Sequence, residues 1–286
     1  MSVLALTILI LSAFMHASWN FLAKQSKGGN LFVWFYIVIS SVILTPIAII
    51  IIIQEGLIID GAGAAIVGGS ILLHIIYALS LQYGYKIGDL SLVYPIARGT
   101  GPFIVAISAI FLYGETITWK SGSGILLIMV SIFILSGGLK IFTRPDTTVS
   151  ILFGIFIGVT IASYTLVDKA AVSVADLSPI IYFYLVVLGQ AIVLAPVMLR
   201  QGRKIGEEWK RTWKYAVSVG VLSPTAYILV LTVMTFTPVS YVAPVREFSI
   251  LIGTVMGSKL LLEKAGKERI IGALLMILGV TLIAIS

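Results

Sequence analysis

Long apolar segments recur along the whole chain, and short polar connections separate them. Ten of these segments approach the ~20 residues that an α-helix needs to cross the hydrocarbon core of a bilayer. Apolar residues within them do not alternate with polar ones, as they would in the strands of a membrane barrel. The pattern therefore predicts an all-α integral membrane protein with ten transmembrane helices, near residues 2–23, 31–53, 63–84, 91–113, 121–140, 149–168, 178–199, 214–236, 239–261 and 268–286.

The composition favours the same class of protein. Hydrophobic residues make up 59% of the 286 positions and charged residues 11%, which is more apolar surface than a soluble core can bury. The net charge of +7 lies mostly in the short connections, where cations flank membrane helices, so we expect a lipid bilayer and no nucleic acid as partner. The N-terminal segment lacks a basic stretch and a cleavage site, which favours a first span over a signal peptide.

The sequence carries no motif for catalysis. It has no cysteine, no metal-ligand set, no nucleophile beside a base and no cofactor fingerprint. We therefore expect no enzyme activity, no catalytic residue, no metal and no cofactor. A phosphate-binding P-loop is also absent from the sequence, so we expect no direct use of ATP.

The two halves of the chain resemble each other, and the matching segments keep the same order at an offset of about 145–150 residues. The matches are residues 17–24 with 162–169, Tyr77 with Tyr227, residues 91–95 with 240–244, and Glu115 with Glu263, where each glutamate precedes a glycine, Gly124 or Gly272, by nine residues. They predict a duplication into two five-helix repeats, residues 1–142 and 148–286. Because five is odd, the second repeat should enter the membrane upside down. Inverted repeats of this kind are common in secondary transporters, which bind substrate near the midplane between the repeats.

This plan resembles the EamA-type permeases of the drug/metabolite transporter superfamily. The similarity rests on ASWN and ASYT in spans 1 and 6, on the prolines of spans 4 and 9, and on FLYGE and LLLE at the ends of those spans. It covers essentially the whole chain and implies a multi-pass permease of the prokaryotic plasma (inner) membrane, as a monomer or homodimer. Such families move amino acids, sugars, nucleotide precursors, amines and drugs, so the resemblance leaves the substrate open.

The even number of spans predicts that both termini lie on the same side of the membrane. Connections 1, 3, 5, 7 and 9 carry fifteen lysines and arginines, whereas connections 2, 4, 6 and 8 carry only Lys120 and Lys169. Since cations stay in the cytoplasm, this bias predicts both termini outside. The family resemblance implies termini inside, and we favour the charge bias because it is so large.

Arg98 and Glu247 are the first candidates for a binding site. Each stands three residues after a proline, Pro95 or Pro244, at matching places in spans 4 and 9. An arginine at the centre of a membrane helix costs about 2.5–3.5 kcal/mol and normally faces a partner inside the bundle. Arg98 is expected either to bind a carboxylate, phosphate or phosphonate of the substrate or to pair with Glu247. Arg98 can have both roles in turn if a zwitterionic substrate opens the pair, places its carboxylate on Arg98 and places its ammonium group on Glu247.

Polar and aromatic residues of other spans complete the predicted substrate site, with packing between helices as the alternative role for each. They are His16, Trp19, Asn20, Tyr77, Tyr164, Tyr227 and Arg246, the last ranked below Arg98 because it points about 100° away from Glu247. His16 and His74 are also candidates for proton coupling, since imidazole titrates between about pH 5 and 8. The alternative for each is a neutral histidine bonded to a neighbouring helix.

The remaining predictions concern helix ends. Pro95 and Pro244 each remove a backbone hydrogen bond inside a span and are expected to break or bend it, while Gly99 and Gly101 beside Pro95 favour close packing. Glu115 and Glu263 stand at span ends, where they should cap or anchor the next helix.

The sequence thus favours a secondary transporter of a small polar metabolite, such as an amino acid or another anionic or zwitterionic compound, working by alternating access. The alternative is a flippase for a lipid-linked carrier, in which Arg98 and Arg246 would form a basic headgroup site beside a lateral opening. An intramembrane enzyme is a third and weaker hypothesis, because no nucleophile has a base nearby in the sequence and neither histidine has a carboxylate nearby in the sequence.

Overall fold

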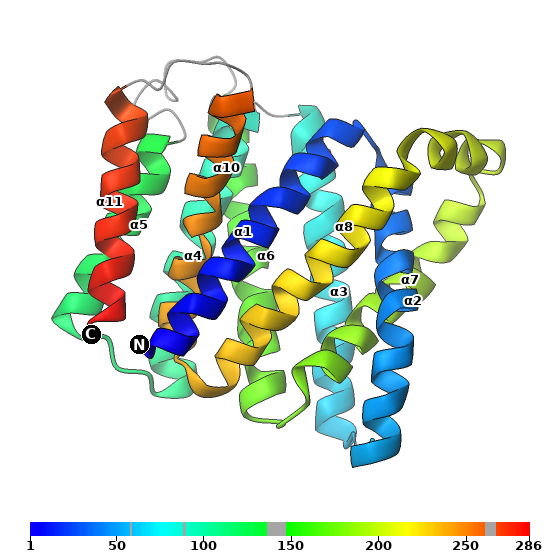
Figure 1. The fold of residues 1–286 in the computed structure, drawn as a ribbon, viewed down its shortest axis with the longest axis horizontal. Coiled ribbons are helices and arrows are strands. Elements are labelled where there is room, and N and C mark those ends of the chain that lie inside the picture. The colour runs from blue at the N-terminus through cyan, green and yellow to red at the C-terminus, as the bar shows by residue number, and fades with distance from the viewer. Residues whose placement is uncertain (58, 88–89, 136–146, 261–266) are drawn as a thin grey trace.

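The computed structural model describes residues 1–57, 59–87, 90–135, 147–260 and 267–286. Within these ranges all regular secondary structure is α-helical (Figure 1). In chain order the helices are α1 (Val3–Ser26), α2 (Asn30–Glu55), α3 (Gly61–Ile87), α4 (Leu90–Tyr113), α5 (Trp119–Leu135), α6 (Thr147–Ser173), α7 (Pro179–Leu199), α8 (Arg203–Phe236), α9 (Val239–Arg246), α10 (Phe248–Leu260) and α11 (Lys267–Ala284). The predicted all-α class is confirmed.

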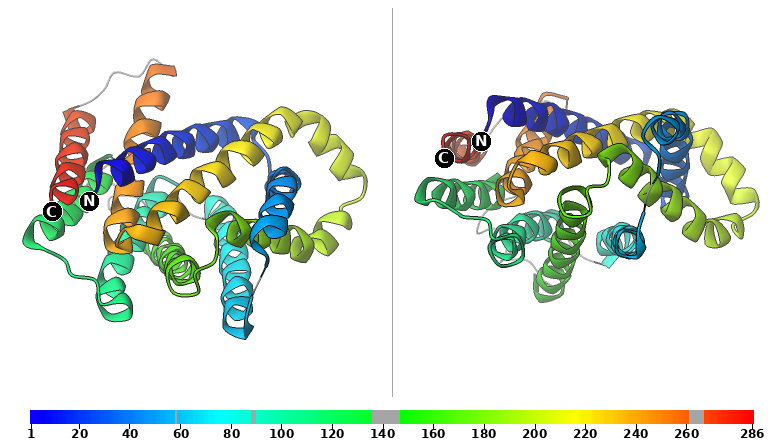
Figure 2. Two further views of the ribbon diagram at one scale, coloured as in Figure 1. Left: turned by 60° about the horizontal axis from the view of Figure 1, so that its bottom comes forward. Right: turned by 90° about the horizontal axis from the view of Figure 1, so that it is seen from below.

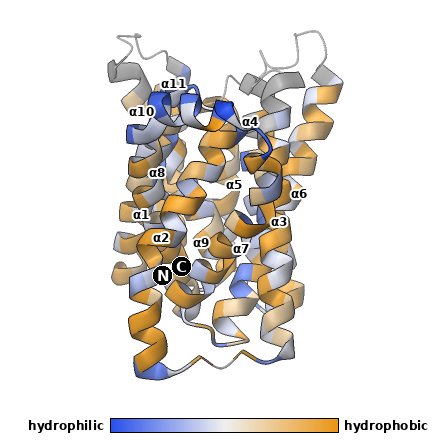
Figure 3. Cartoon of the chain, turned by 90° about the vertical axis from the view of Figure 1, so that its right-hand side faces the viewer, coloured by the Kyte–Doolittle hydropathy of each residue, from blue (hydrophilic) through white to orange (hydrophobic). Residues whose placement is uncertain are grey.

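The helices coincide with the predicted spans. Among the described residues, eight stretches are long and apolar enough to cross a membrane, and the helices at 119–135 and 270–284 are shorter and also apolar. Hydrophobic residues cover most of the helices, and hydrophilic ones gather at the end of the bundle away from the termini (Figure 3). The chain is therefore a multi-pass integral membrane protein.

Helix α8 is longer than the sequence pattern predicts. Residues 200–213 lie between the predicted spans 178–199 and 214–236, but most of them form the first turns of this 34-residue helix. The stretch between Lys214 and Val219 has no glycine or proline, so nothing ends the helix at the expected boundary. Gly202, with φ of +54°, makes the turn before it, in a backbone region that favours glycine. The N-terminal part of α8 lies at the outer edge of the bundle (Figure 1).

Helix pairing follows the correspondence between the two halves. Helices α1 and α8 pack together, as do their counterparts α6 and α3, while α2 packs on α7 and α5 on α11 (Figure 2). Exchanging the halves therefore maps the first two pairs onto each other and each of the other two pairs onto itself. The pattern agrees with a duplication, and the inverted orientation of the repeats and their boundaries stay predictions.

The two ends of the chain lie side by side. The ammonium group of Met1 donates to the carbonyl oxygen of Ala284 at 3.1 Å (Figure 1). This contact confirms that both termini lie at the same end of the bundle, as an even number of spans requires.

Glycines allow helices α4 and α6 to approach closely. A Cβ atom on Gly158 would lie 2.6 Å from Cβ of Thr100, and one on Gly154 would lie 2.8 Å from Cβ of Ile96. In the opposite direction, a Cβ on Gly101 would lie 2.8 Å from a methyl carbon of Ile161. Small residues at such crossings bring backbones together where lipid supplies no hydrophobic drive. The packing role predicted for Gly101 is confirmed, whereas Gly99 faces open space.

The two predicted helix breaks differ. Span 9 divides at Glu247 into α9 and α10, three residues after Pro244. Helix α4 instead runs without interruption from Leu90 to Tyr113, so the predicted break at Pro95 is wrong. Pro95 and Pro244 both occupy the sixth position of their helices, where only one early hydrogen bond is lost. Proline therefore does not explain the difference, and the break coincides with the buried carboxylate of Glu247.

Two charged side chains secure the junction between α8 and α9. Lys169 was counted among the cations of a connection, but it is buried and its Nζ donates to the carbonyl oxygens of Met234 at 2.6 Å and Thr237 at 3.3 Å. Glu115 accepts from the backbone N–H groups of Val239 at 2.7 Å and Ser240 at 2.9 Å.

These contacts place a cation at a helix C-terminus and an anion at a helix N-terminus, as the helix dipole favours. Glu115 thus caps α9, which is distant in sequence, rather than the next helix along the chain. Glu263, its predicted counterpart, lies outside the described residues.

Replacing Gly158 by alanine should destabilise the protein, because the added Cβ meets Thr100 and the α4 backbone. The expected cost is about 1–3 kcal/mol, which thermal unfolding in detergent would report as a lower Tm. Gly68→Ala is the matched control, since nothing lies within 4 Å of a Cβ added there. Equal Tm values for the two variants would contradict the packing argument.

The charge bias predicts that both termini face the outside. Because the chain has no cysteine, single substitutions can be labelled selectively. In intact cells, Ser286→Cys should react with a membrane-impermeant maleimide, and Lys210→Cys should react only after permeabilisation. The reverse pattern would show that the termini are cytoplasmic.

Candidate functional site

A cavity of about 110 Å³ lies inside the bundle, among helices α1 to α4 and α6 to α9. Four helices of each half contribute to its lining, and α5 and α11 contribute none of the described lining residues. Eight of the residues predicted from sequence line it: His16, Trp19, His74, Tyr77, Arg98, Tyr164, Tyr227 and Arg246. The fold therefore brings most of the predicted substrate site to one place, although their role in binding stays a prediction.

Arg98, which lines the cavity, forms a buried ion pair with Glu247. The Nη1 atom of Arg98 donates to Oε1 and Oε2 of Glu247 at 3.2 and 3.3 Å, and their side chains are 4% and 0% exposed. Nη2 of Arg98 lies 2.8 Å from Nε2 of His16. The pairing proposed from the matching positions in spans 4 and 9 is thus formed.

The contact with Arg98 determines the protonation of His16. A guanidinium group only donates hydrogen bonds, so Nε2 of His16 must accept and the ring proton must lie on Nδ1. A neutral His16 therefore holds one edge of the Arg98 guanidinium, while Glu247 holds another.

Arg246 joins the same cluster. Its Nε atom lies 3.8 Å from Oε1 of Glu247, and its guanidinium carbon lies 6.0 Å from the centre of the Tyr227 ring. The side chain is 3% exposed, and Nε has no hydrogen-bond partner among the described residues. Among the described contacts, two guanidinium groups therefore share one carboxylate, which gives this part of the site one positive charge more than it has negative charges.

Asp168 is a buried acid that the sequence analysis missed. Its carboxylate is fully buried and accepts from Ser70 Oγ at 2.6 Å, from Tyr182 OH at 2.5 Å and from the Tyr227 hydroxyl. Nε2 of His74 lies 3.0 Å from its other side. His74, which has no acidic neighbour in sequence, thus gains one in space.

The reason for the omission is the length of α6. The hydropathy pattern ended span 6 at residue 168, which placed Asp168 and Lys169 at the membrane surface. The helix continues to Ser173, so both side chains turn into the bundle. A charged pair inside the repeated segment ASYTLVDK was the available clue.

Aromatic rings enclose the rest of the cavity. The His74 ring lies 4.3 Å from that of Tyr164, and Tyr164 lies 5.4 Å from Tyr77 and 6.3 Å from Tyr227. On α1, His16 and Trp19 meet edge to face at 4.9 Å, and Nε1 of Trp19 is buried without a hydrogen-bond partner among the described residues. The cavity thus offers cations and N–H donors on an apolar wall.

Two predicted site residues do not line the cavity. Asn20 donates through Nδ2 to the carbonyl oxygen of His16 at 2.8 Å, which turns its amide back along α1. Glu247 does not line the cavity itself, but it pairs with Arg98 and Arg246, which do. Asn20 is thus placed to support its own helix, and Glu247 to hold the two arginines.

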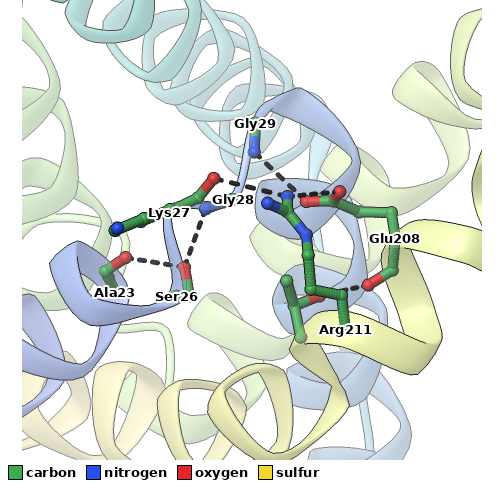
Figure 4. A network of polar contacts seen from close by, with 8 residues as sticks. Ala23, Ser26, Lys27, Gly28, Gly29, Glu208 and Arg211 are labelled. Carbon is green, nitrogen blue, oxygen red and sulfur yellow. Dashed lines mark hydrogen bonds and ion pairs between the residues drawn. The ribbon is translucent and has the colours of Figure 1, made fainter.

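A larger hollow of about 470 Å³ lies at the surface, between the α1–α2 turn and the start of α8. Figure 4 shows Arg211 reaching Glu208 at 2.5 Å and the carbonyl of Lys27 at 3.3 Å, while the N–H of Gly29 points to Glu208 at 3.4 Å. The Arg211 side chain is 54% exposed. This network ties the amphipathic start of α8 to the α1–α2 turn and contains none of the predicted site residues.

The buried and the exposed Arg–Glu pairs should differ strongly in energy. Glu247→Gln removes the carboxylate that both guanidinium groups share, and Arg98→Gln removes the donor from which that carboxylate accepts at 3.2 and 3.3 Å. Each change should cost about 3–5 kcal/mol, whereas the double variant should cost less than the sum. The exposed pair is the matched control, and Arg211→Gln or Glu208→Gln should cost about 0–1 kcal/mol. Thermal or denaturant unfolding in detergent measures both cycles, and additive losses at Arg98 and Glu247 would contradict the pairing.

Comparison with known proteins finds a family resemblance. A model of the EamA-like transporter family matches residues 148–285, which cover α6 to the end of α11. A search of curated protein sequences found no match. Among solved structures, one crystal structure is similar to this chain, with a TM-score of 0.75 and 13% sequence identity. The match covers 97% of each of the two chains. At this identity the likeness establishes the fold alone.

The family match and the apolar helices agree with each other. Together they support a membrane transporter of the drug/metabolite kind. Residues 148–285 of the chain are thus similar to the EamA-like transporter family.

Proposed function

We propose that this protein is a secondary transporter of a small polar metabolite that carries a carboxylate or phosphate group, with amino acids among the substrates. The observation that carries the proposal is the excess of buried cations beside the cavity. Arg98 and Arg246 both line it, and Glu247 is the one acidic side chain that the described contacts pair with them. An anionic group entering the cavity would balance the remaining charge.

The chemistry of the two arginines fits this class of ligand. A guanidinium presents several N–H groups in one plane and can bind two oxygens of a carboxylate or phosphate at once. The Nε–H of Arg246 and the Nε1–H of Trp19 are donors without partners among the described residues. Since buried donors normally find partners, these two favour a ligand that accepts hydrogen bonds.

A zwitterion can use the Arg98–Glu247 pair itself. Its carboxylate would take the place of Glu247 on Arg98, and its ammonium group would lie between the Glu247 carboxylate and the surrounding tyrosine rings. The rings favour this arrangement because aromatic faces attract cations. The pair would then close the site when it is empty and open when the substrate arrives.

The size and position of the cavity favour a compact metabolite over a lipid-linked carrier. Its volume of about 110 Å³ is below the roughly 300–1,000 Å³ of pockets for drug-sized ligands. Both arginines are nearly fully buried, whereas a headgroup site for a flippase would open sideways to the bilayer.

The way the cavity is built supports alternating access as the proposed mechanism. Four helices of each half line it, so movement of one half against the other would open it to one side of the membrane at a time. With no P-loop in the sequence, the free energy would come from an ion or metabolite gradient. The resemblance to EamA-type permeases supports a place in the prokaryotic plasma membrane.

Transport by purified protein in liposomes tests the proposal. The probes are radiolabelled L-alanine, L-glutamate, L-lactate and phosphoethanolamine, with ethanolamine as a cation that lacks an anionic group. We expect saturable uptake of at least one anion-bearing probe and none of ethanolamine. Arg98→Lys and Arg246→Lys should raise its KM by about tenfold or more, or ~1.4 kcal/mol, because lysine lacks the planar fork.

Two comparisons separate the roles within the site. Glu247→Gln should impair uptake of alanine more than uptake of lactate, since only the amino acid carries an ammonium group. Arg211→Lys, at the exposed pair, is the control and should leave KM unchanged. Selective uptake of ethanolamine, or unaltered kinetics in both cavity arginine variants, would refute the proposed anion site.

A further inference from the structure

We propose that His74 and Asp168 form the site of a coupling proton, and that one proton bound there accompanies each monoanion held by Arg98 and Arg246. The second half of this statement rests on the proposed function, because it takes the anion site as given. The first half rests on the surroundings of Asp168 alone.

Asp168 is enclosed by donors from three other helices. Ser70 and His74 approach from α3, Tyr182 from α7 and Tyr227 from α8, with heavy-atom distances of 2.6 Å for Ser70, 2.5 Å for Tyr182 and 3.0 Å for His74. Three of these donors are neutral hydroxyl groups. Among the described contacts, His74 is therefore the one partner of Asp168 that can take up a proton and become a cation.

His74 connects this carboxylate to the cavity. Its side chain is 13% exposed and lines the cavity, whereas that of Asp168 is 0% exposed. A carboxylate only accepts, so Nε2 of His74 carries the proton that it shares with Asp168. An incoming proton then passes from a hydronium ion to Nδ1 of His74, which leaves water and an imidazolium paired with the carboxylate. The charge of the pair changes from −1 to 0, and release to water reverses the step.

His16 is a poorer site for this proton, although the sequence offers both histidines. Its Nε2 already accepts from Arg98. Protonation of this nitrogen, the one that carries no proton in the neutral ring, would place a third cation beside Arg98 and Arg246 and would break that hydrogen bond. Of the two candidates, the geometry therefore selects His74.

The buried charges balance when the site is empty and the pair is deprotonated. Among the described residues, two guanidinium groups and the Glu247 carboxylate leave one positive charge, which the Asp168 carboxylate cancels. A bound monoanion upsets this balance by one negative charge. A proton on His74 restores it, and a neutral interior is strongly favoured where the surroundings are apolar.

The other charged and titratable groups near Asp168 do not alter this balance. Lys169 on the same helix points to the C-terminus of α8, and Glu115 caps α9 at the same junction, so these opposite charges offset each other. The hydroxyl of Tyr113 donates to the carbonyl of Leu166. Tyr164, which faces His74, is neutral at physiological pH.

Tyr227 links the two sites directly. Its hydroxyl donates to Asp168, and the face of its ring lies 6.0 Å from the guanidinium carbon of Arg246. A change of charge on the Asp168–His74 pair would therefore act on the ring that packs against the anion site. This contact gives the coupling a physical path.

Proton binding is tested without any substrate. Infrared difference spectra of proteoliposomes stepped between about pH 8 and pH 5 should show an imidazolium signal in the wild type. His74→Gln should abolish it, and Asp168→Asn should move its midpoint to lower pH. Glu115→Gln is the matched control for loss of a carboxylate and should leave the signal unchanged. A signal that survives His74→Gln would overturn the assignment.

Coupling is tested with L-glutamate and L-lactate, which are net monoanions near neutral pH. With one proton per anion, an imposed difference of one pH unit should drive about tenfold accumulation, independent of membrane voltage set with valinomycin and potassium. This ratio should fall to about one in His74→Gln and Asp168→Asn and stay near tenfold in Glu115→Gln. Gel filtration establishes that each variant is folded, and the ratio corrects for differences in activity.

The outcomes distinguish this inference from the proposed function. If anion uptake persists but its pH-driven accumulation survives in both variants, or if voltage drives it, the coupling site is refuted while the anion transporter stands. If neither probe is transported, the proposed anion function fails for these monoanions, and with it the coupling. The infrared result then decides the proton site by itself.

Discussion

Buried charge that must be balanced within an apolar bundle is the constraint on which the rest of this structure depends. The side chains of Arg98, Arg246 and Glu247 are nearly fully buried. Each charge would carry a large free-energy cost without the others. Their contacts draw α4 and α9 toward the central cavity and hold His16 of α1 beside them. Among the described contacts the cluster has one cation in excess, and that excess is the basis of the proposed preference for an anionic ligand.

The helices around this cluster pack closely at the α4–α6 contact, and the helix of span 9 is interrupted at the cluster itself. Glycines bring α4 against α6, and Lys169 and Glu115 satisfy the helix ends at the α8–α9 junction. The helix of span 9 is interrupted at Glu247 itself. A carboxylate at a helix interruption can exchange partners with less disturbance than one inside a regular helix. The pair with Arg98 is thus well placed to respond to a substrate.

Hydropathy was sufficient to place the helices, because a span must satisfy its own backbone and expose apolar side chains to lipid. It failed where helices pass beyond the apolar stretch. Helix α8 begins about eleven residues before the predicted span 8, and α6 ends five residues after the predicted span 6. In both cases polar residues continue a helix that nothing in the sequence breaks. The second error hid Asp168, since a charge at a predicted boundary is normally a surface charge.

The sequence by itself determined the class of the protein and the opposite charges of Arg98 and Glu247, and it predicted the duplication, because apolar length, segment order and spacing can all be read along the chain. Only the tertiary structure decided which charged side chains contact one another. It joined His74 to Asp168 and Arg246 to Glu247, and it turned Asn20 away from the cavity. These outcomes depend on the rotation and crossing of helices that are distant in sequence, so no spacing along the chain could specify them. Residues 91–102, SLVYPIARGTGP, illustrate this division, since the sequence indicated Arg98 and its pairing with Glu247, whereas the contact of Arg98 with His16 came only from the fold.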